Sequence, residues 1–280
     1  IDYQHIQNGL WNWGYGINWF LSSRFTVFLH PSYLAMYLNF SLFLLIREES
    51  APSGWIHLKT NWRRGLILLF LTIQVLLISK AGLFIAGLLF VWWVLMLFRN
   101  GSVRAGIALS SMVVLATIAL FWKAPELSNR IVNMAGFFDE KESDSGESND
   151  LRVMVWNEAL QLSRENIVLG VGIGDVRNEL NERYERAEMK EARERNLNAH
   201  SQFIQFHLSA GLAAVFLFVM CFIEILASRK GMIGAVFLAV LLISNMLVES
   251  MLETQAGMVF FALFGILFIY LSKTHQLVES

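Results

Sequence analysis

The chain has 280 residues, of which 55% are hydrophobic and 16% are charged, and its formal net charge is −1. Soluble domains carry about 25% charged residues, so much of this surface is expected to face lipid rather than water. The near-neutral charge gives no indication of nucleic-acid binding, and the single cysteine, Cys221, excludes an internal disulfide and a cysteine zinc site.

The first 20 residues are aromatic and polar, and they lack the basic-then-apolar order of a signal peptide. Their tryptophans and tyrosines suit an interfacial aromatic belt, with stacking on sugar rings as the alternative. Because the chain opens at Ile1 without an initiator methionine, we interpret it as the C-terminal part of a longer membrane protein.

Seven apolar segments are long enough to be membrane-spanning helices. A bilayer core of about 30 Å needs roughly 20 apolar residues of helix, and somewhat fewer when polar ends snorkel. The segments are residues 32–46, 65–79, 82–98, 105–122, 203–227, 231–248 and 256–271.

The basic residues of the short connections predict the orientation, because Lys and Arg are retained on the cytoplasmic side. With seven crossings, all of them fall on one side: Arg47, Lys59, Arg63, Arg64, Arg99, Arg104, Arg229, Lys230 and Lys273. The predicted fold class is an all-α, polytopic membrane bundle of about seven transmembrane helices with a large, mostly helical periplasmic loop. Its parts are a periplasmic segment with interfacial aromatics (1–31), helices 1–4 (32–122), the loop (123–202), and helices 5–7 with a short cytoplasmic tail (203–280).

The large loop has internal organisation. Residues 139–150 are acidic and rich in Ser and Gly, which predicts a mobile stretch. Residues 151–166 carry apolar side chains at helical spacing and predict an amphipathic helix lying along the membrane surface: Leu151, Val155, Ala159 and Leu162. Residues 175–195 interleave Glu with Arg and Lys at three- and four-residue offsets, which is typical of a solvated helix.

Three glycines in the loop, Gly170, Gly172 and Gly174, resemble a nucleotide-binding glycine loop only weakly. No buried strand precedes them, and the spacing lacks the third glycine of that fingerprint. A tight turn between two surface helices is the favoured interpretation.

His200 is the leading candidate for chemistry, because it lies where the polar loop meets the fifth predicted span. Histidine takes a proton near neutral pH and is suited to act as a general base towards a sugar hydroxyl. On position alone, an interfacial histidine that caps a helix with Asn198 and Ser201 is an equal alternative. The other histidines have no carboxylate or thiol at ligand spacing, so no metal site is assigned.

Cations on the predicted outer side are candidates for binding an anion. Lys80 stands in a very short outer loop, where the positive-inside rule disfavours a cation. It suits an anionic lipid head group such as a pyrophosphate, with a snorkelling lysine as the alternative. Arg24 and Arg152 are expected on the same side, each singly more typical of a surface residue. Glu249 and Glu253 lie in an outer turn, where they balance these cations, hold a hydroxyl-rich acceptor or are simply solvated.

An ordered set of motifs resembles a known family. Arg24 precedes a His-Pro-Ser turn (30–32), and Ser-Lys-Ala-Gly (79–82) stands at an outer helix end. The loop carries Arg152, Trp156, Ala159 and Leu160 in the pattern Arg-x-x-x-Trp-x-x-Ala-Leu, then Leu-Gly-Val-Gly-x-Gly (169–174) and Asn-Ala-His-Ser-x-Phe (198–203) before Gly211. In this order the chain resembles the O-antigen ligase and O-antigen polymerase superfamily, as its C-terminal portion.

The resemblance implies an inverting glycosyltransferase without metal or cofactor. Its donor is a glycan on undecaprenyl pyrophosphate, and its acceptor is lipid A core or another lipid-linked glycan. Arg24, Lys80 and Arg152 are then expected to bind the pyrophosphate, and His200 to orient or deprotonate the acceptor hydroxyl. Glu249, Glu253 and Trp156 are expected to contact the acceptor or support these residues. The implied location is the bacterial inner membrane, multi-pass, with the loop in the periplasm and membrane lipids around the helices.

The chain departs from the family pattern at two points. Members usually carry Arg where this chain has Lys80, and Lys lacks the bidentate fork that Arg offers a phosphate. Members also usually have about ten to twelve spans. The sequence leaves ligase and polymerase open, with a slight lean towards ligase. A transporter or lipid-binding subunit is the alternative class, disfavoured because the predicted spans are nearly free of charged residues.

Overall fold

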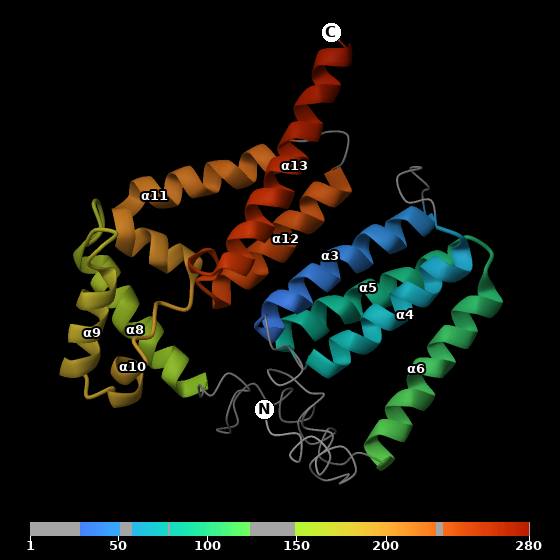
Figure 1. The fold of residues 1–280 in the computed structure, drawn as a ribbon, viewed down its shortest axis with the longest axis horizontal. Helices are drawn as coiled ribbons and strands as arrows, with labels where there is room; N and C mark the ends of the chain where they lie inside the picture. The colour runs from blue at the N-terminus through green and yellow to red at the C-terminus, as the bar shows by residue number, and fades with distance from the viewer. Residues whose placement is uncertain (1–28, 51–57, 78, 124–148, 228–231, 280) are drawn as a thin grey trace, which may run out of the picture. The chain divides into compact units, whose positions relative to one another are not determined.

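The computed structural model describes residues 29–50, 58–77, 79–123, 149–227 and 232–279 (Figure 1). Within these ranges the regular structure is entirely helical, which confirms the all-α prediction. The chain divides into two compact units, residues 1–145 and residues 146–280. Arg24 and most of the acidic stretch 139–150 lie outside the described residues.

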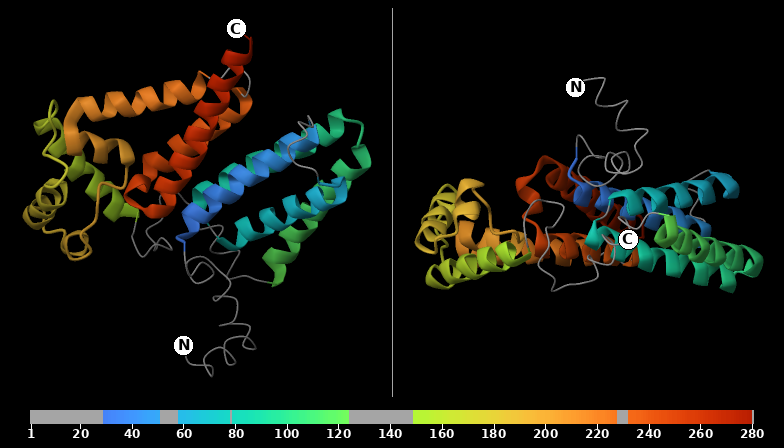
Figure 2. Two further views of the ribbon diagram at one scale, coloured as in Figure 1. Left: turned by 45° about the horizontal axis from the view of Figure 1, so that its top comes forward. Right: turned by 90° about the horizontal axis from the view of Figure 1, so that it is seen from below.

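Among its described residues, the first unit has four helices, of which α3 packs against both α4 and α5, and α6 packs against α5. Figures 1 and 2 show α3, α4 and α5 side by side. The bounds are α3 (Pro31–Ser50), α4 (Thr60–Leu77), α5 (Lys80–Arg99) and α6 (Val103–Lys123).

Polar side chains buried between these helices bind them together. The Asn39 amide donates to the carbonyl of Gly82 at 3.0 Å, and the Gln74 amide donates to the carbonyl of Ala35 at 2.9 Å. A Cβ at Gly82 would lie 2.6 Å from the Ala35 Cβ, so glycine permits the close approach of α5 to α3. Small residues and interhelical hydrogen bonds of this kind are typical of helices packed in a membrane.

The second unit combines the loop helices with the last three predicted spans. Its helix α11 packs against α12 and α13 and also against α8 and α9. The bounds are α8 (Asn149–Glu165), α9 (Val176–Arg186), α10 (Lys190–Glu194), α11 (Gln202–Leu226), α12 (Met232–Val248), the 3-10 helix η3 (Met251–Glu253) and α13 (Gln255–Glu279).

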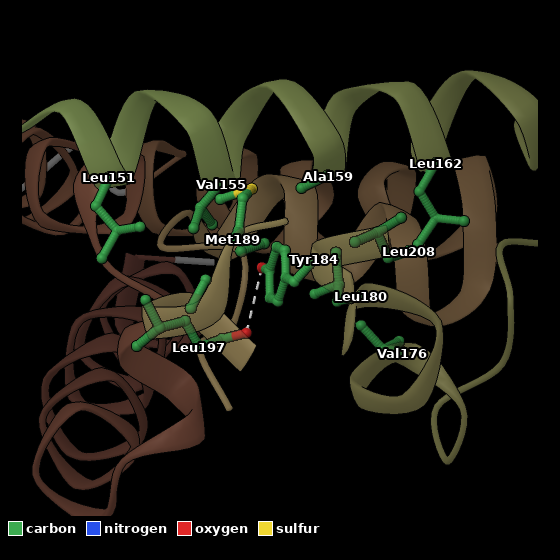
Figure 3. Close-up of a cluster of buried hydrophobic side chains, with 12 residues drawn as sticks. Leu151, Val155, Ala159, Leu162, Val176, Leu180, Tyr184, Met189, Leu197 and Leu208 are labelled. Atoms are coloured by element: carbon green, nitrogen blue, oxygen red, sulfur yellow. Dashed lines mark hydrogen bonds between the residues drawn. The ribbon is translucent and has the colours of Figure 1, made fainter. Parts of the chain in front are cut away.

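The loop helices have an apolar core of their own (Figure 3). The stripe of α8 that runs through Val155, Ala159 and Leu162 points at Leu180 and Tyr184 of α9, and every one of these side chains is buried. The Tyr184 hydroxyl donates to the carbonyl of Leu197 at 3.3 Å, which closes the core. The predicted amphipathic helix over 151–166 is therefore confirmed as α8, but its apolar stripe packs against α9 and α10 rather than against lipid. Its place along the membrane surface stays a prediction.

Each of the seven predicted spans lies on a helix. By length and composition, two helices in the described part of the chain are apolar enough to cross a membrane. They are α5 and α11, with mean hydropathy of 2.4 and 2.3. Only 33% and 28% of the residues in those windows are buried within the protein. Apolar side chains that the protein does not cover are suited to contact lipid.

The helix α11, expected as one continuous span over 203–227, is broken at Ala210 and Gly211. Gly211 has φ +64°, and a Cβ there would lie 1.9 Å from the carbonyl oxygen of Val168. Two hydrogen bonds to the turn between α8 and α9 replace the helical bond that the break removes. The Leu212 N–H donates to Ile167 at 3.2 Å, and the Leu208 carbonyl accepts from Val171 at 2.7 Å. The turn thus satisfies both the Leu212 N–H and the Leu208 carbonyl. Figure 1 shows the two limbs of α11 at an angle.

Candidate functional site

His200 stands in a turn between α10 and α11, in a backbone conformation that few residues other than glycine adopt. Its φ is +44°, and holding a side-chain residue there costs about 1–3 kcal/mol. The Asn198 side-chain oxygen accepts from the His200 N–H at 3.0 Å, and the Trp156 indole donates to the His200 carbonyl at 3.3 Å. These two bonds hold the His200 backbone on both sides of its Cα.

A second set of contacts binds this turn to η3 and the first turns of α11. The Glu253 carboxylate accepts from the Asn198 amide at 2.6 Å and also from the Gln205 amide. The Gln205 side-chain oxygen accepts from the Ala199 N–H at 3.3 Å, and the Gln202 side-chain oxygen accepts from the Leu252 N–H at 2.7 Å. These bonds join residues 198–205, which contain His200, to η3, which lies about 50 residues further along the chain.

One carboxylate lies between a guanidinium and the imidazole. Glu249 Oε1 is 3.1 Å from Arg152 Nη2, and Glu249 Oε2 is 3.8 Å from His200 Nδ1. We call Arg152, His200 and Glu249 the charge cluster. Its side chains are 22%, 10% and 21% exposed, so the cluster is sheltered but open to a ligand. The contact of Glu249 with His200 is an ion pair only when the imidazole is protonated.

The second unit brings together five of the residues that the sequence singled out. Arg152, Trp156, His200, Glu249 and Glu253 come from α8, the turn before α11, and the turn that contains η3. Their convergence turns separate surface positions into one site.

Lys80 lies in the first unit, at the first position of α5, and its side chain is exposed. Ser79 precedes it as the N-cap and accepts from the Gly82 N–H at 3.3 Å. Its convergence with Arg152 stays a prediction, as does that of Arg24, which lies outside the described residues.

Sequence reasoning missed Gln202 and Gln205. Two buried glutamines at the start of an apolar span are a usable signal, because such side chains need hydrogen-bond partners. It also missed the contact between Ser163 of α8 and His207 of α11, where Oγ and Nδ1 are 2.6 Å apart. That contact binds the loop helices to the first limb of α11.

The charge cluster has the side chains that the transfer of a group to a hydroxyl requires. Arg152 is a permanent cation suited to bind phosphate oxygens, and His200 is a base within reach of the same space. Glu249 neutralises Arg152 in the protein alone, so an anionic ligand has to compete with it. A cation, a base and a carboxylate that lie this close together suit a reaction in which a hydroxyl loses a proton while an anion departs.

Comparison with known proteins gives an independent result. The model of the O-antigen ligase family matches residues 65–219, which is more than half of the chain and includes Lys80, Arg152 and His200. A comparison with curated proteins gave no match.

Proposed function

Because the chain belongs to the O-antigen ligase family, we propose that it transfers a glycan from undecaprenyl pyrophosphate to a hydroxyl of lipid A core. Membership makes it a membrane-associated, glycosyltransferase-type enzyme that works with lipid-linked glycans. The observation that carries the finer proposal is the contact of Glu249 with both Arg152 and His200. We place the reaction at the periplasmic face of the bacterial inner membrane.

The proposed step is a direct displacement. His200 takes the proton of the acceptor hydroxyl, and the hydroxyl oxygen attacks the anomeric carbon of the donor. The bond from that carbon to the pyrophosphate oxygen breaks, and the electron pair leaves with undecaprenyl pyrophosphate, so the anomeric configuration inverts. Arg152 offsets the charge that grows on the leaving group, a contribution on the order of 3–4 kcal/mol for a preorganised donor.

Glu249 has two parts in this proposal. Before the donor binds, it neutralises Arg152, and the pyrophosphate then replaces it. During transfer, its second oxygen faces the imidazole that gains a proton and stabilises the resulting positive charge. Glu249→Gln is expected to lower the KM for the donor and also to lower kcat. If Glu249 had a purely structural role, the substitution would change neither KM nor kcat, since the amide keeps the size of the side chain.

Lys80 and Arg24 are proposed as further cations for the pyrophosphate. Lys80→Arg is expected to retain transfer or to improve donor binding, because Arg adds a bidentate fork. Lys80→Glu is expected to be inactive because it places an anion beside the leaving group. With cations in this role we propose that no metal takes part, so transfer should persist in EDTA.

The acceptor decides between ligase and polymerase. In cells that lack the protein, polymer left on its lipid carrier indicates the ligase, and single unpolymerised repeats on the acceptor indicate the polymerase. Complementation with Arg152→Ala should fail, whereas Arg164→Ala, an exposed arginine of the same helix, should restore transfer. Equal restoration by both variants would remove Arg152 from the site.

The multi-pass topology with its periplasmic loop is likewise a proposal, supported by the basic residues of the short connections. Ser145→Cys in a Cys221→Ala background should react with a membrane-impermeant thiol reagent added from the periplasmic side. A reaction from the cytoplasmic side alone would overturn the orientation.

A further inference from the structure

The turn between α8 and α9 carries four outward apolar side chains, which we call the apolar tip: Ile167, Val168, Leu169 and Ile173. They are 49%, 69%, 80% and 82% exposed. Exposed turns in water are usually built from Gly, Pro, Asn, Asp and Ser. A cluster of exposed aliphatic residues on such a turn marks an interaction surface.

The apolar tip is fixed to a defined point of α11. The hydrogen bonds of Ile167 and Val171 with the two sides of the helix break hold the turn against it. Gly170, at φ +67°, allows this approach, because a Cβ there would lie 2.4 Å from the carbonyl oxygen of Leu208. The tip therefore lies at the level where the second limb of α11, residues 212–226, begins.

That second limb is short for a membrane crossing. Residues 212–226 rise about 22 Å at 1.5 Å per residue, against about 30 Å for the hydrocarbon core. Arg229 and Lys230 follow in the sequence and suit the inner boundary. When the far end of the limb reaches that boundary, its beginning lies below the outer boundary, and the apolar tip lies there with it.

The surface and the backbone of the tip suit that depth. Leu212 and Phe216, at the start of the second limb, are 53% and 64% exposed, so the apolar surface of the tip continues onto the limb. Irregular backbone is tolerated near hydrocarbon only where its polar groups are satisfied. Here Gly170 donates to Asn166 at 3.0 Å, and Val171 and Leu212 donate across the break.

We propose that the apolar tip inserts into the outer leaflet of the phospholipid bilayer and anchors the loop helices to the membrane surface. Interfacial elements bury their apolar face about 5–10 Å into the boundary between head groups and acyl chains. The anchor keeps the turn, and the helices that continue from it, at a constant height above the lipid. This inference depends on the second limb of α11 crossing the membrane and is independent of glycan transfer.

A depth measurement tests the proposal directly. Ile173→Cys, in a Cys221→Ala background, is labelled with the fluorophore NBD. The full chain is then placed in nanodiscs of phosphatidylethanolamine and phosphatidylglycerol that contain 5-doxyl lipid. The matched control is Arg186→Cys at the other end of α9, where the native side chain is 71% exposed and charged. We expect nitroxide quenching at 173 to exceed that at 186 at least about twofold, and iodide quenching to show the reverse order.

Equal quenching at the two positions, or stronger iodide quenching at 173, would overturn the proposal. Occupancy of the tip by a second copy of the chain would also overturn it. That arrangement would appear as pyrene excimer emission from the Ile173→Cys label in nanodiscs that hold two copies.

Discussion

The helices α5 and α8 use their apolar residues in opposite ways. In α5, an outward face is made of Phe84, Leu88, Val91 and Leu95, each more than half exposed, while Trp93 and Leu97 fill the opposite side. In α8, the stripe through Val155 and Leu162 is buried, and the charged residues lie outside it. A helix that is apolar on every side needs lipid, whereas a helix with one apolar stripe can close a small core in water.

The largest expected effect comes from the core of the loop helices. Leu162→Ala removes a fully enclosed side chain and should lower the free energy of unfolding by about 2–5 kcal/mol. Leu160→Ala, on the exposed side of the same helix at 40% exposure, should change it by less than about 0.5 kcal/mol. The two variants are compared by heating the purified chain and measuring, by limited proteolysis, how much of residues 149–197 has unfolded at each temperature. Equal losses would mean that the stripe is not the core of α8.

The outward face of α5 is the other half of the comparison. Leu88→Lys should make membrane insertion of α5 less favourable by about 3 kcal/mol. The Leu88 side chain is 56% exposed and lies on the face that is predicted to contact lipid. Leu88→Ala keeps the position apolar and should insert normally. Glycosylation mapping of the inserted fraction gives the measurement. Normal insertion of Leu88→Lys would place this face in water and break the contrast with α8.

The break in α11 lies where the loop helices meet a predicted membrane span. Gly211→Ala adds a Cβ at a positive φ and against the Val168 carbonyl, so it should destabilise the second unit by about 2 kcal/mol or more. Gly87→Ala in α5, where a Cβ would meet nothing within 4 Å, should be neutral. The two variants are compared by thermal unfolding in detergent, and an unchanged midpoint for Gly211→Ala would mean that the break is not required.

The smallest expected effect is at the surface of α9. Arg186 and Glu182 form an exposed pair at 3.0 Å with side chains 71% and 59% exposed. Arg186→Ala should change the free energy of unfolding by less than about 1 kcal/mol, and less still at high salt. A chemical denaturation midpoint at low and high salt checks this, and a large loss at both would assign the residue to the core rather than to the solvated surface.

The sequence predicts the helices well because long apolar runs dominate it, and each predicted span falls on a helix. It also identifies Arg152 and His200 as candidates within one predicted loop, without showing that they converge. It does not predict the break in α11, because Gly211 stands within an apolar run. The hydrogen bonds that Leu208 and Leu212 make across the break go to Val171 and Ile167, in a turn far away in the sequence. Nor does hydrophobic spacing in α8 say what covers the stripe, which is why lipid was expected where α9 and α10 lie.

The charge cluster shows the same limit. Glu249 is 97 residues from Arg152 in the sequence, and only the folded second unit brings the carboxylate to the guanidinium. The left-handed conformation of His200 depends on Asn198 and Trp156, and the latter bond joins residues 44 positions apart. Local patterns identify such residues as candidates, and tertiary contacts decide which of them act together.

The central claim is that His200 removes the acceptor proton in glycan transfer. Its most direct test is transfer of a glycan from undecaprenyl pyrophosphate to lipid A core by the purified protein, comparing His200→Ala with His207→Ala. His207 lies in α11, contacts Ser163 and is outside the charge cluster. We expect His200→Ala to lower kcat by about 10²–10⁴-fold while both variants remain inserted and folded, and His207→Ala to retain transfer. Full activity in His200→Ala, with the fold intact, would contradict the proposed mechanism.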